Sequence, residues 1–242
     1  MIQTGCCGFP RAHRLCYEYL DVVEVQQVFY HPPRLSTVER WRHQAPADFT
    51  FTPKAWQLIS HEPSSPTYRR LRMELSVSFD HYGSFRPTRE VYEAWERSRD
   101  LALTLQAPIL LFRCPASFTP SGEHKANLRS FMRGIDRRGL VLAWEPRGEW
   151  ADGEIAELCH ELDLIHAVDL FQRLPVTGEV AYFRLHGRGG YQYQYTDQEL
   201  AQLTEWCGGH PFAYCLFNPS TGSGLRNTSM FDDALRFIEL PG

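Results

Sequence analysis

Short hydrophobic segments alternate along the whole chain with longer stretches that mix apolar and polar residues. The short segments are rich in Val, Ile, Phe, Tyr and Leu, which is typical of buried β-strands. The longer stretches have the character of amphipathic helices. The pattern predicts strands over residues 3–7, 22–25, 49–54, 109–113, 141–145, 165–169, 181–186 and 212–217, and helices over residues 36–43, 88–105, 121–136, 152–162, 196–207 and 230–237.

Two of the predicted helices begin with a recognisable capping sequence. Thr88 is followed by Glu90, and Thr196 is followed by Asp197 and Glu199. A threonine hydroxyl accepts a hydrogen bond from a free backbone N–H of the first turn, and early acidic residues complement the helix dipole. These signals predict the N-terminal end of each of the two helices.

Eight strands alternating with helices predict the fold class α/β, as a single (β/α)8 barrel of the TIM type. The chain has 242 residues, close to the roughly 250 that such a barrel needs, and we expect one domain over residues 1–242. A doubly wound open sheet is the alternative, but no G-x-G-x-x-G follows an early strand. Residues 60–85 are the least regular part and predict a long excursion over one end of the barrel.

Composition narrows the class of protein. Hydrophobic residues make up 43% of the chain, which is enough for a large core, and the formal charge of −4 argues against a generally basic nucleic-acid-coating protein. No apolar run approaches the roughly 20 residues of a membrane helix, and no basic-then-apolar leader follows Met1. Seven cysteines without a C-x-x-C pair predict reduced, buried thiols and a cytoplasmic protein.

Polar residues gather where a barrel places its active site, at the carboxyl ends of the strands. In residues 49–54 the aromatic residues alternate with threonines and Lys54, so Lys54 is expected to point into the barrel mouth. In residues 181–186, Arg184 and His186 share a face. The strand-end candidates for one rim are Glu24, Lys54, Arg113, Glu145, Arg147, Asp169, Arg184, His186 and Asn218. Such a cluster forms either a structural ring of ion pairs or a site for an anionic ligand, and we favour the second.

The loop after the seventh predicted strand adds a glycine-rich segment with one cation. Arg188 lies among three glycines, whose backbone N–H groups can approach a phosphate or carboxylate. Tyr191, Tyr193 and Tyr195 follow in alternation, either to stack on a base or sugar or to pack on the loop. Arg188 and Tyr191 are therefore further candidates for substrate binding.

A metal site is left open by the sequence but is not favoured, and no cofactor is indicated. His61, Glu145, Asp169 and His186 are chemically suitable ligands, but no H-E-x-x-H, H-x-H or D-x-D spacing organises them. Lys54 and the arginines would also compete with a cation. Lys54 would be able to form a Schiff base if it were desolvated beside arginines, but an ion pair with Glu24 or Glu145 is the simpler expectation.

Several strings resemble a family of barrel proteins of unknown function, DUF72, also called YecE-like. They begin with residues 4–10 (TGCCGFP) and 23–30 (VEVQQVFY), continue with 51–55 (FTPKA), 60–61 (SH), 108–112 and 115–118, and end with 144–147 (WEPR), Trp150, Asp169 and 182–187 (YFRLHG). Tyr30 and His61 lie in these strings and are taken as further substrate-binding candidates. The resemblance implies a TIM-type barrel, but no established reaction, cofactor or catalytic residue.

The chain departs from the pattern of that family at two places. Arg113 stands where the family usually has Gln, which makes this rim more basic. The paired asparagines expected after the eighth strand, here Asn218 and Asn227, are separated by an insertion over residues 219–226. The insertion puts in question whether this loop belongs to a shared site.

The favoured hypothesis is an enzyme of the hydrolase or lyase type that binds a phosphate-bearing or other anionic small substrate at the rim. Arginines 113, 147, 184 and 188 would position the anion, and Glu145, Asp169 or His186 would transfer protons, with Glu24 and Lys54 as a paired acid and base. One alternative is a nucleic-acid-binding protein or metal-dependent phosphodiesterase, whose affinity would fall steeply with salt. Another is a non-catalytic barrel that binds a protein partner, in which the charged rim is structural. No membrane partner is expected, and the oligomeric state is left open.

Overall fold

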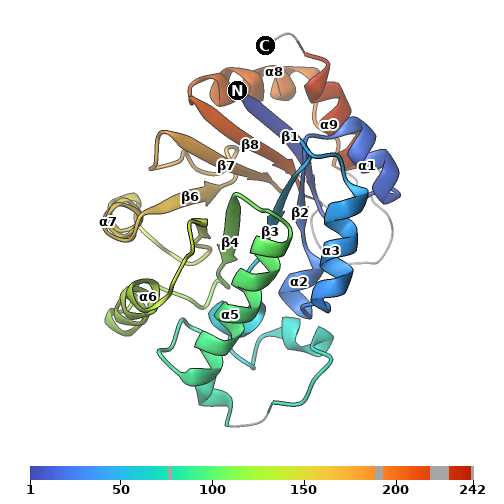
Figure 1. Cartoon of the computed structure of the whole chain (residues 1–242). Coiled ribbons are helices and arrows are strands. Elements are labelled where there is room, and N and C mark those ends of the chain that lie inside the picture. Colours follow the sequence, from blue (N-terminus) through green and yellow to red (C-terminus); the bar gives the residue numbers. More distant parts are fainter. Residues whose placement is uncertain (76–77, 189–192, 219–228, 241–242) are drawn as a thin grey trace.

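The computed structural model describes residues 1–75, 78–188, 193–218 and 229–240, and one parallel sheet lies at its centre. The sheet has eight strands in the order β3-β2-β1-β8-β7-β6-β5-β4, with the helices on its outer surface (Figure 1). The strands are β1 (Ile2–Cys7), β2 (Val22–Val25), β3 (Thr50–Pro53), β4 (Ile109–Arg113), β5 (Val141–Glu145), β6 (Leu164–Val168), β7 (Val180–Leu185) and β8 (Phe212–Phe217).

The two edge strands of this sheet, β3 and β4, approach each other and nearly close it into a barrel. Lys54 and Leu111 form a parallel bridge, and the backbone N–H of Ala55 donates to the carbonyl of Leu111 at 2.8 Å. A closed parallel sheet buries strand edges that would otherwise expose unpaired backbone groups. The barrel predicted from the sequence is therefore confirmed, and the open doubly wound sheet is wrong.

The helices agree with the sequence pattern where they are long and differ where they are short. The helices are α1 (His13–Tyr19), α2 (Gln27–Tyr30), α3 (Leu35–Gln44), α4 (Gln57–Ser60), α5 (Arg89–Thr104), α6 (Gly122–Gly134), α7 (Asp152–Leu162), α8 (Asp197–Gly208) and α9 (Ser229–Ile238). The sequence pattern did not predict α1, α2 and α4, because helices of four to seven residues are too short to show a period of 3.6.

Both predicted caps are present. The Thr88 hydroxyl accepts from the backbone N–H of Val91 at 3.4 Å at the start of α5. At the start of α8, Thr196 accepts from the N–H of Glu199 at 3.2 Å, and the Glu199 carboxylate accepts from the N–H of Thr196 at 2.9 Å. This reciprocal pair satisfies two backbone donors that the helix itself leaves free.

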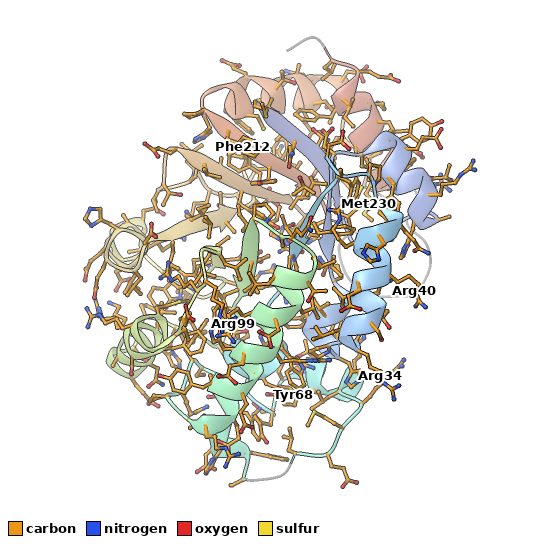
Figure 2. All side chains as sticks on the ribbon, viewed as in Figure 1. Arg34, Arg40, Tyr68, Arg99, Phe212 and Met230 are labelled. Atoms are coloured by element: carbon orange, nitrogen blue, oxygen red, sulfur yellow. The ribbon has the colours of Figure 1, made fainter. Side chains whose placement is uncertain are left out.

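Two apolar layers form the core. Large side chains fill the space between the sheet and the outer helices, as Figure 2 shows around Met230 of α9. The second layer fills the inside of the barrel with the side chains of Cys7, Val22, Ile109, Leu111, Ala143, Ile165, Ala167, Tyr182, Tyr214 and Leu216. The next inward positions toward the carboxyl ends of β4, β5 and β7 are charged, since they hold Arg113, Glu145 and Arg184. The barrel interior thus changes from apolar to ionic along the strands.

The irregular segment between α4 and α5 contains two 3-10 helices, η1 (Pro66–Arg70) and η2 (Phe79–His81). It follows β3, so it begins on the side of the barrel where the strands end. Backbone N–H groups of Gly83 and Phe85 donate to the carbonyls of Leu58 and Ile59 and tie its end back to α4. Its hydrogen bonds make it a folded excursion rather than a linker.

All seven cysteines are buried with free thiols, as the sequence predicted. Among the described residues, no helix is long and apolar enough to cross a membrane.

The close approach of β1 and β2 depends on a glycine. A Cβ atom added to Gly5 would lie 1.7 Å from the carbonyl oxygen of Val22, so the strands have to separate to accept any side chain. We predict that Gly5→Ala lowers the free energy of unfolding by about 3 kcal/mol or more, because overpacking against backbone cannot relax. Urea denaturation followed by circular dichroism measures this change.

Gly153→Ala in α7 is the matched control. A Cβ atom added to Gly153 would have no other atom within 4 Å, so stability should stay unchanged or rise slightly. Equal stabilities for the two variants would show that the β1–β2 contact is not constrained by Gly5.

Candidate functional site

A buried ionic network occupies the carboxyl end of the barrel interior. Arg184 on β7 donates from Nε to Oε2 of Glu24 at 2.8 Å and from Nη2 to Oε1 of the same residue at 2.9 Å. Tyr182 donates to Oε2 of Glu24 at 3.0 Å, and Gln26 donates to Oε1. Glu24 has no exposed area. With four donors on one carboxylate, the geometry suits anchoring of Arg184 rather than contact with a substrate.

The same arginine reaches a second carboxylate on β5. Nη1 of Arg184 donates to Oε2 of Glu145 at 2.5 Å, and Nε of Arg113 lies 3.8 Å from this oxygen. Burial by itself would raise the pKa of Glu145, but the positive charges of Arg184 and Arg113 outweigh it and hold the pKa at about 2. Glu145 is therefore ionised throughout the physiological range, with its other oxygen, Oε1, left toward the barrel mouth.

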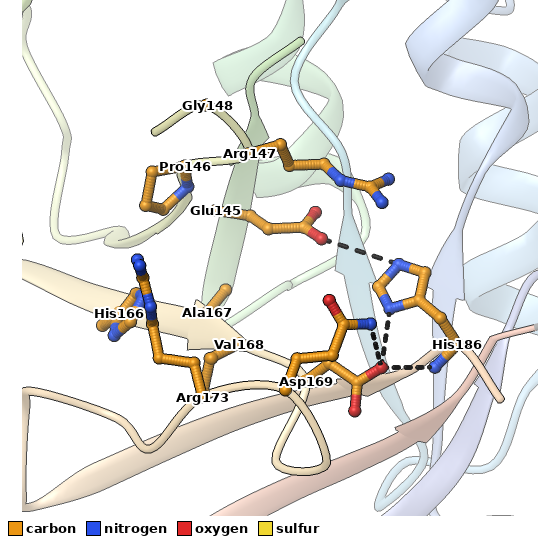
Figure 3. Close-up of a pocket in the computed structure, with 11 residues that line it drawn as sticks. Glu145, Pro146, Arg147, Gly148, His166, Ala167, Val168, Asp169, Arg173 and His186 are labelled. Carbon is orange, nitrogen blue, oxygen red and sulfur yellow. Dashed lines mark hydrogen bonds and ion pairs between the residues drawn. The ribbon is translucent and has the colours of Figure 1, made fainter. Parts of the chain in front are cut away.

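His186, just after β7, lies between two carboxylates (Figure 3). Its Nδ1 is 3.3 Å from Oδ2 of Asp169, and its Nε2 is 3.6 Å from Oε1 of Glu145. Asp169 is held in turn by the backbone N–H groups of His186 and Phe171, each at 3.1 Å, and by the side-chain amide of Gln172 at 3.0 Å. The Nε2 atom is buried and has no hydrogen-bond partner. Asp169 thus orients the ring, and Nε2 faces Oε1 of Glu145 beyond hydrogen-bond distance.

A pocket of about 270 Å³ opens beside this histidine. Its walls come from the ends of β5, β6 and β7, and the lining residues include Glu145, Asp169 and His186 together with Arg147, Gly148, His166, Gln172 and Arg173. Arg147 forms no ion pair with any residue that the structure describes. Arg173 pairs with the exposed Asp152 at 3.2 Å and donates to the carbonyl of Trp150 at 2.8 Å. The pocket is therefore lined by the unpaired guanidinium of Arg147 and by the imidazole of His186.

The pocket includes residues that were not predicted from the sequence. His166 accepts a hydrogen bond at Nδ1 from the N–H of Val176 at 3.3 Å, so its neutral form carries its hydrogen on Nε2. Burial and the neighbouring Arg173 lower the pKa of His166 to about 4. The sequence prediction considered only inward-facing residues at the strand ends. It therefore missed His166, which lies on the outward face of β6. Gln172 and Arg173 follow Asp169 by three and four residues. In a helical turn, this spacing brings side chains to the same side as Asp169, so it would have predicted both residues as part of the site.

Lys54 lies in a different environment from the one expected. Neither Glu24 nor Glu145 is within the 4.0 Å ion-pair distance, so the expected direct ion pair is wrong. Instead, Nζ donates to Oε1 of Gln26 at 3.0 Å and lies 4.2 Å from the centre of the Phe29 ring. Burial, with repulsion from two arginines, lowers the pKa of Lys54 to about 7. A positive charge at this position is therefore easily lost.

The remaining candidates lie outside the pocket. His61 is 2% exposed and its Nδ1 is 2.9 Å from the Ser60 hydroxyl; burial and the charges of Arg113 and Lys54 lower its pKa to about 3. Tyr30 packs under the guanidinium of Arg70 at 4.7 Å.

After β7 and β8, the candidates likewise make local contacts. Arg188 lies over the Phe171 ring at 4.6 Å and 3.8 Å from Glu199. Asn218 is buried, and its backbone N–H donates to the carbonyl of Leu185 at 2.8 Å. Tyr191 and the insertion at 219–226 lie outside the described residues.

The acidic side chains of the mouth form hydrogen bonds and ion pairs with arginines, a tyrosine and amide groups. They are not arranged around a common centre. Within the described ranges, no group of three or more His, Cys, Asp and Glu side chains has the geometry to hold a metal ion. Of the four residues considered as ligands from the sequence, Glu145, Asp169 and His186 lie together, whereas His61 packs 4.9 Å from the Phe29 ring and does not line the pocket.

Comparison with protein families identifies the chain's relatives. The model of the family described as "Protein of unknown function DUF72" matches residues 10–239, which confirms the resemblance seen in the sequence. A search of curated proteins found no match.

Solved structures share the barrel. A DUF72 family protein from Enterococcus faecalis V583 is 20% identical, with a TM-score of 0.72, and the match covers 98% of this chain and 96% of that one. A DUF72 family protein from Thermotoga maritima is 17% identical, with a TM-score of 0.67 over 99% and 98% of the two chains. An AP endonuclease of family 2 from Brucella melitensis is 13% identical, with a TM-score of 0.57 over 95% and 96%. At these identities the likeness shows the fold alone.

Removal of Arg184, which pairs with both carboxylates, should lower the free energy of unfolding more than removal of any other residue of the site. We predict that Arg184→Met lowers the free energy of unfolding by about 3–5 kcal/mol, because it leaves Glu24 and Glu145 buried without their common cation. The deficit should shrink as the pH falls toward 4, since protonated carboxyls no longer repel each other. Thermal melting over this pH range measures both effects.

Arg89→Met is the control, because Arg89 also pairs with a glutamate but its side chain is 85% exposed. Its melting temperature should barely change. A similarly small change for Arg184→Met would contradict the buried-network interpretation.

Proposed function

The chain belongs to the DUF72 family, whose function is unknown, and we propose that it is an enzyme of the hydrolase or lyase type acting on a small anionic substrate. In this proposal the substrate lies in the pocket at the ends of β5, β6 and β7. His186 transfers a proton to or from it, and arginines hold its negative charge. The barrels that resemble the chain include the AP endonuclease, so the architecture is compatible with an enzyme.

The observation that carries the proposal is the position of Nε2 of His186. This nitrogen is buried at the pocket wall, has no hydrogen-bond partner, and belongs to a ring whose other nitrogen faces Asp169 at 3.3 Å. Nε2 lies 3.6 Å from the ionised Oε1 of Glu145, beyond hydrogen-bond distance, so this nitrogen keeps its capacity to take up a proton. A histidine oriented by a carboxylate, with the second nitrogen free, is the usual arrangement of a general acid or base.

The pocket's positive charge supports an anionic substrate. Arg147 lines the pocket without an acidic partner among the described residues, and Arg173 adds a second guanidinium that an exposed aspartate neutralises only in part. Guanidinium groups bind phosphate and carboxylate in a bidentate manner and remain charged. A phosphate-bearing substrate is the case we favour.

Glu145 has two functions in this scheme. Its Oε2 is occupied by Arg184, whereas Oε1 lies 3.6 Å from Nε2 of His186. When Nε2 has taken up a proton, this permanently ionised carboxylate stabilises the imidazolium. Hydrolysis and lysis both need such a step, in which a proton leaves water or a C–H bond and later reaches the leaving group.

A metal-dependent phosphodiesterase that acts on nucleic acid is the alternative. The likeness to an AP endonuclease concerns fold, and the absence of a three-ligand cluster in the described part of the chain favours the anion pocket. Duplex or single-stranded DNA binding that weakens steeply between low and moderate salt would instead support the alternative.

Removal of the acid–base group should abolish activity without unfolding the protein. We predict that His186→Asn reduces turnover by about 10²- to 10⁴-fold. The assay is release of inorganic phosphate, or loss of substrate, across a panel of phosphorylated sugars and acids. His160→Asn, at an exposed position on α7, should keep full activity. An active His186→Asn enzyme would remove this residue from the mechanism.

The anion site can be measured without knowledge of the substrate. We predict that inorganic phosphate raises the melting temperature of the protein and that Arg147→Ala weakens phosphate binding by about tenfold, as expected for loss of one charged hydrogen-bond donor. Arg133→Ala, which alters an exposed ion pair with Glu161 on the outer helices, should leave the affinity unchanged. Equal affinities in all three proteins would place any bound phosphate elsewhere.

A further inference from the structure

At the ends of β3 and β4, next to the pocket wall that β5 forms, the barrel mouth contains a further buried titratable group, Lys54. Lys54 pairs in register with Leu111 across the seam that closes the barrel, and Arg113 follows Leu111 by two residues on the same inward face. The side chains of Lys54 and Arg113 therefore extend toward the mouth from adjacent strands. His61 and Phe29 pack against the same corner.

The Lys54 amine is only partly satisfied. Lys54 is 4% exposed, and among the described residues its amine donates a side-chain hydrogen bond only to the neutral amide of Gln26. No carboxylate in the described part of the chain lies within ion-pair distance of it, and the attraction of Glu24 and Glu145 is outweighed by burial and by the repulsion of Arg184 and Arg113. Burial and like charge both favour the uncharged amine, which is the nucleophilic form of lysine.

The small number of lysines in the chain is a further reason to single out Lys54. Only two of its 25 basic residues are lysines, Lys54 and Lys125, and all the others are arginines. Lys125 lies on the outer helix α6 and forms an ion pair with Glu154 at 2.6 Å. A guanidinium serves as well as an ammonium for charge alone, but only the amine can lose its proton and add to a carbonyl group.

We propose that Lys54 forms a reversible imine with the carbonyl group of an anionic aldehyde or ketone that enters the mouth. The amine nitrogen bonds to the carbonyl carbon, the carbonyl oxygen leaves as water with the two amine protons, and hydrolysis reverses the step. Arg113, whose side chain is 21% exposed and shares Glu145 with Arg184, is placed to hold the anionic group of the reactant. This activity does not require the proton transfer at His186.

Reductive trapping tests the proposal directly. Native protein is treated with glyoxylate and sodium cyanoborohydride, which reduces the imine to a stable secondary amine, and peptide mass spectrometry locates the adduct. We expect the ratio of labelling at Lys54 to labelling at Lys125 to be at least about tenfold higher in native protein than in urea-unfolded protein. Because burial and the arginines hold the pKa of Lys54 at about 7, its labelling should rise through neutral pH and then level off.

Two variants separate the outcomes. Lys125→Arg should retain the full Lys54 adduct, and Lys54→Arg should lose the preferential label. Native protein labelled only at Lys125 or at the α-amino group would overturn the proposal, and this result needs no variant to fold. A failed turnover assay for His186 leaves the trapping result unaffected, so the two proposals fail separately.

Discussion

The sharing of one buried guanidinium between two carboxylates is the constraint on which the barrel mouth depends. Arg184, Glu24 and Glu145 stand on β7, β2 and β5, which are distributed around the barrel. A charge of this kind costs several kcal/mol to bury unless it is paired with good geometry. The three strands must therefore keep their register and distance for the ions to meet, and the ionic contact couples closure of the barrel to the placement of its polar residues.

The same contact orients the candidate catalytic groups. Because Arg184 binds one oxygen of Glu145, the other oxygen is directed to His186, 3.6 Å away. Asp169 approaches the histidine from the other side and is fixed by backbone amides as well as by Gln172. Asp169 and His186 thus each lie directly after the last residue of a strand, β6 and β7, and the hydrogen bonds of Asp169 hold the two side chains in a defined geometry.

The sequence predicted the positions of these side chains better than their partners. Alternation along the strands correctly placed Lys54, Glu145 and Arg184 on the inward face. It did not predict that Arg184 would take both carboxylates, because that choice depends on how far each side chain reaches across the barrel. A planar fork with five donors in fixed directions binds two carboxylates on different sides, whereas an ammonium has three donors at a single atom and no such fork. Lys54 was therefore left with the amide of Gln26.

The elements and residues that the sequence did not predict have equally physical reasons. Helices α2 and α4 have four residues each, too few for a hydrophobic period, and they form because the barrel packs their side chains. His166 reaches the pocket from the outward face of β6, where alternation assigns a residue to the helix layer. The loop that carries Tyr191 lies outside the described residues, so that candidate stays a prediction.

The pKa values of two histidines reflect the burial and the charges of the barrel mouth. Burial lowers the pKa of both His61 and His166, and the positive charge of neighbouring arginines lowers it further, to about 3 and about 4. Burial is the larger cause for both imidazoles and the nearby guanidinium groups are the smaller one, while the single positive charge of Arg184 balances only one of the two negative charges of Glu24 and Glu145. A divalent cation that bound Glu24 or Oε2 of Glu145 would have to displace Arg184. In the function proposed above, an anion bound at the mouth would lower the repulsion between Arg113 and Arg147.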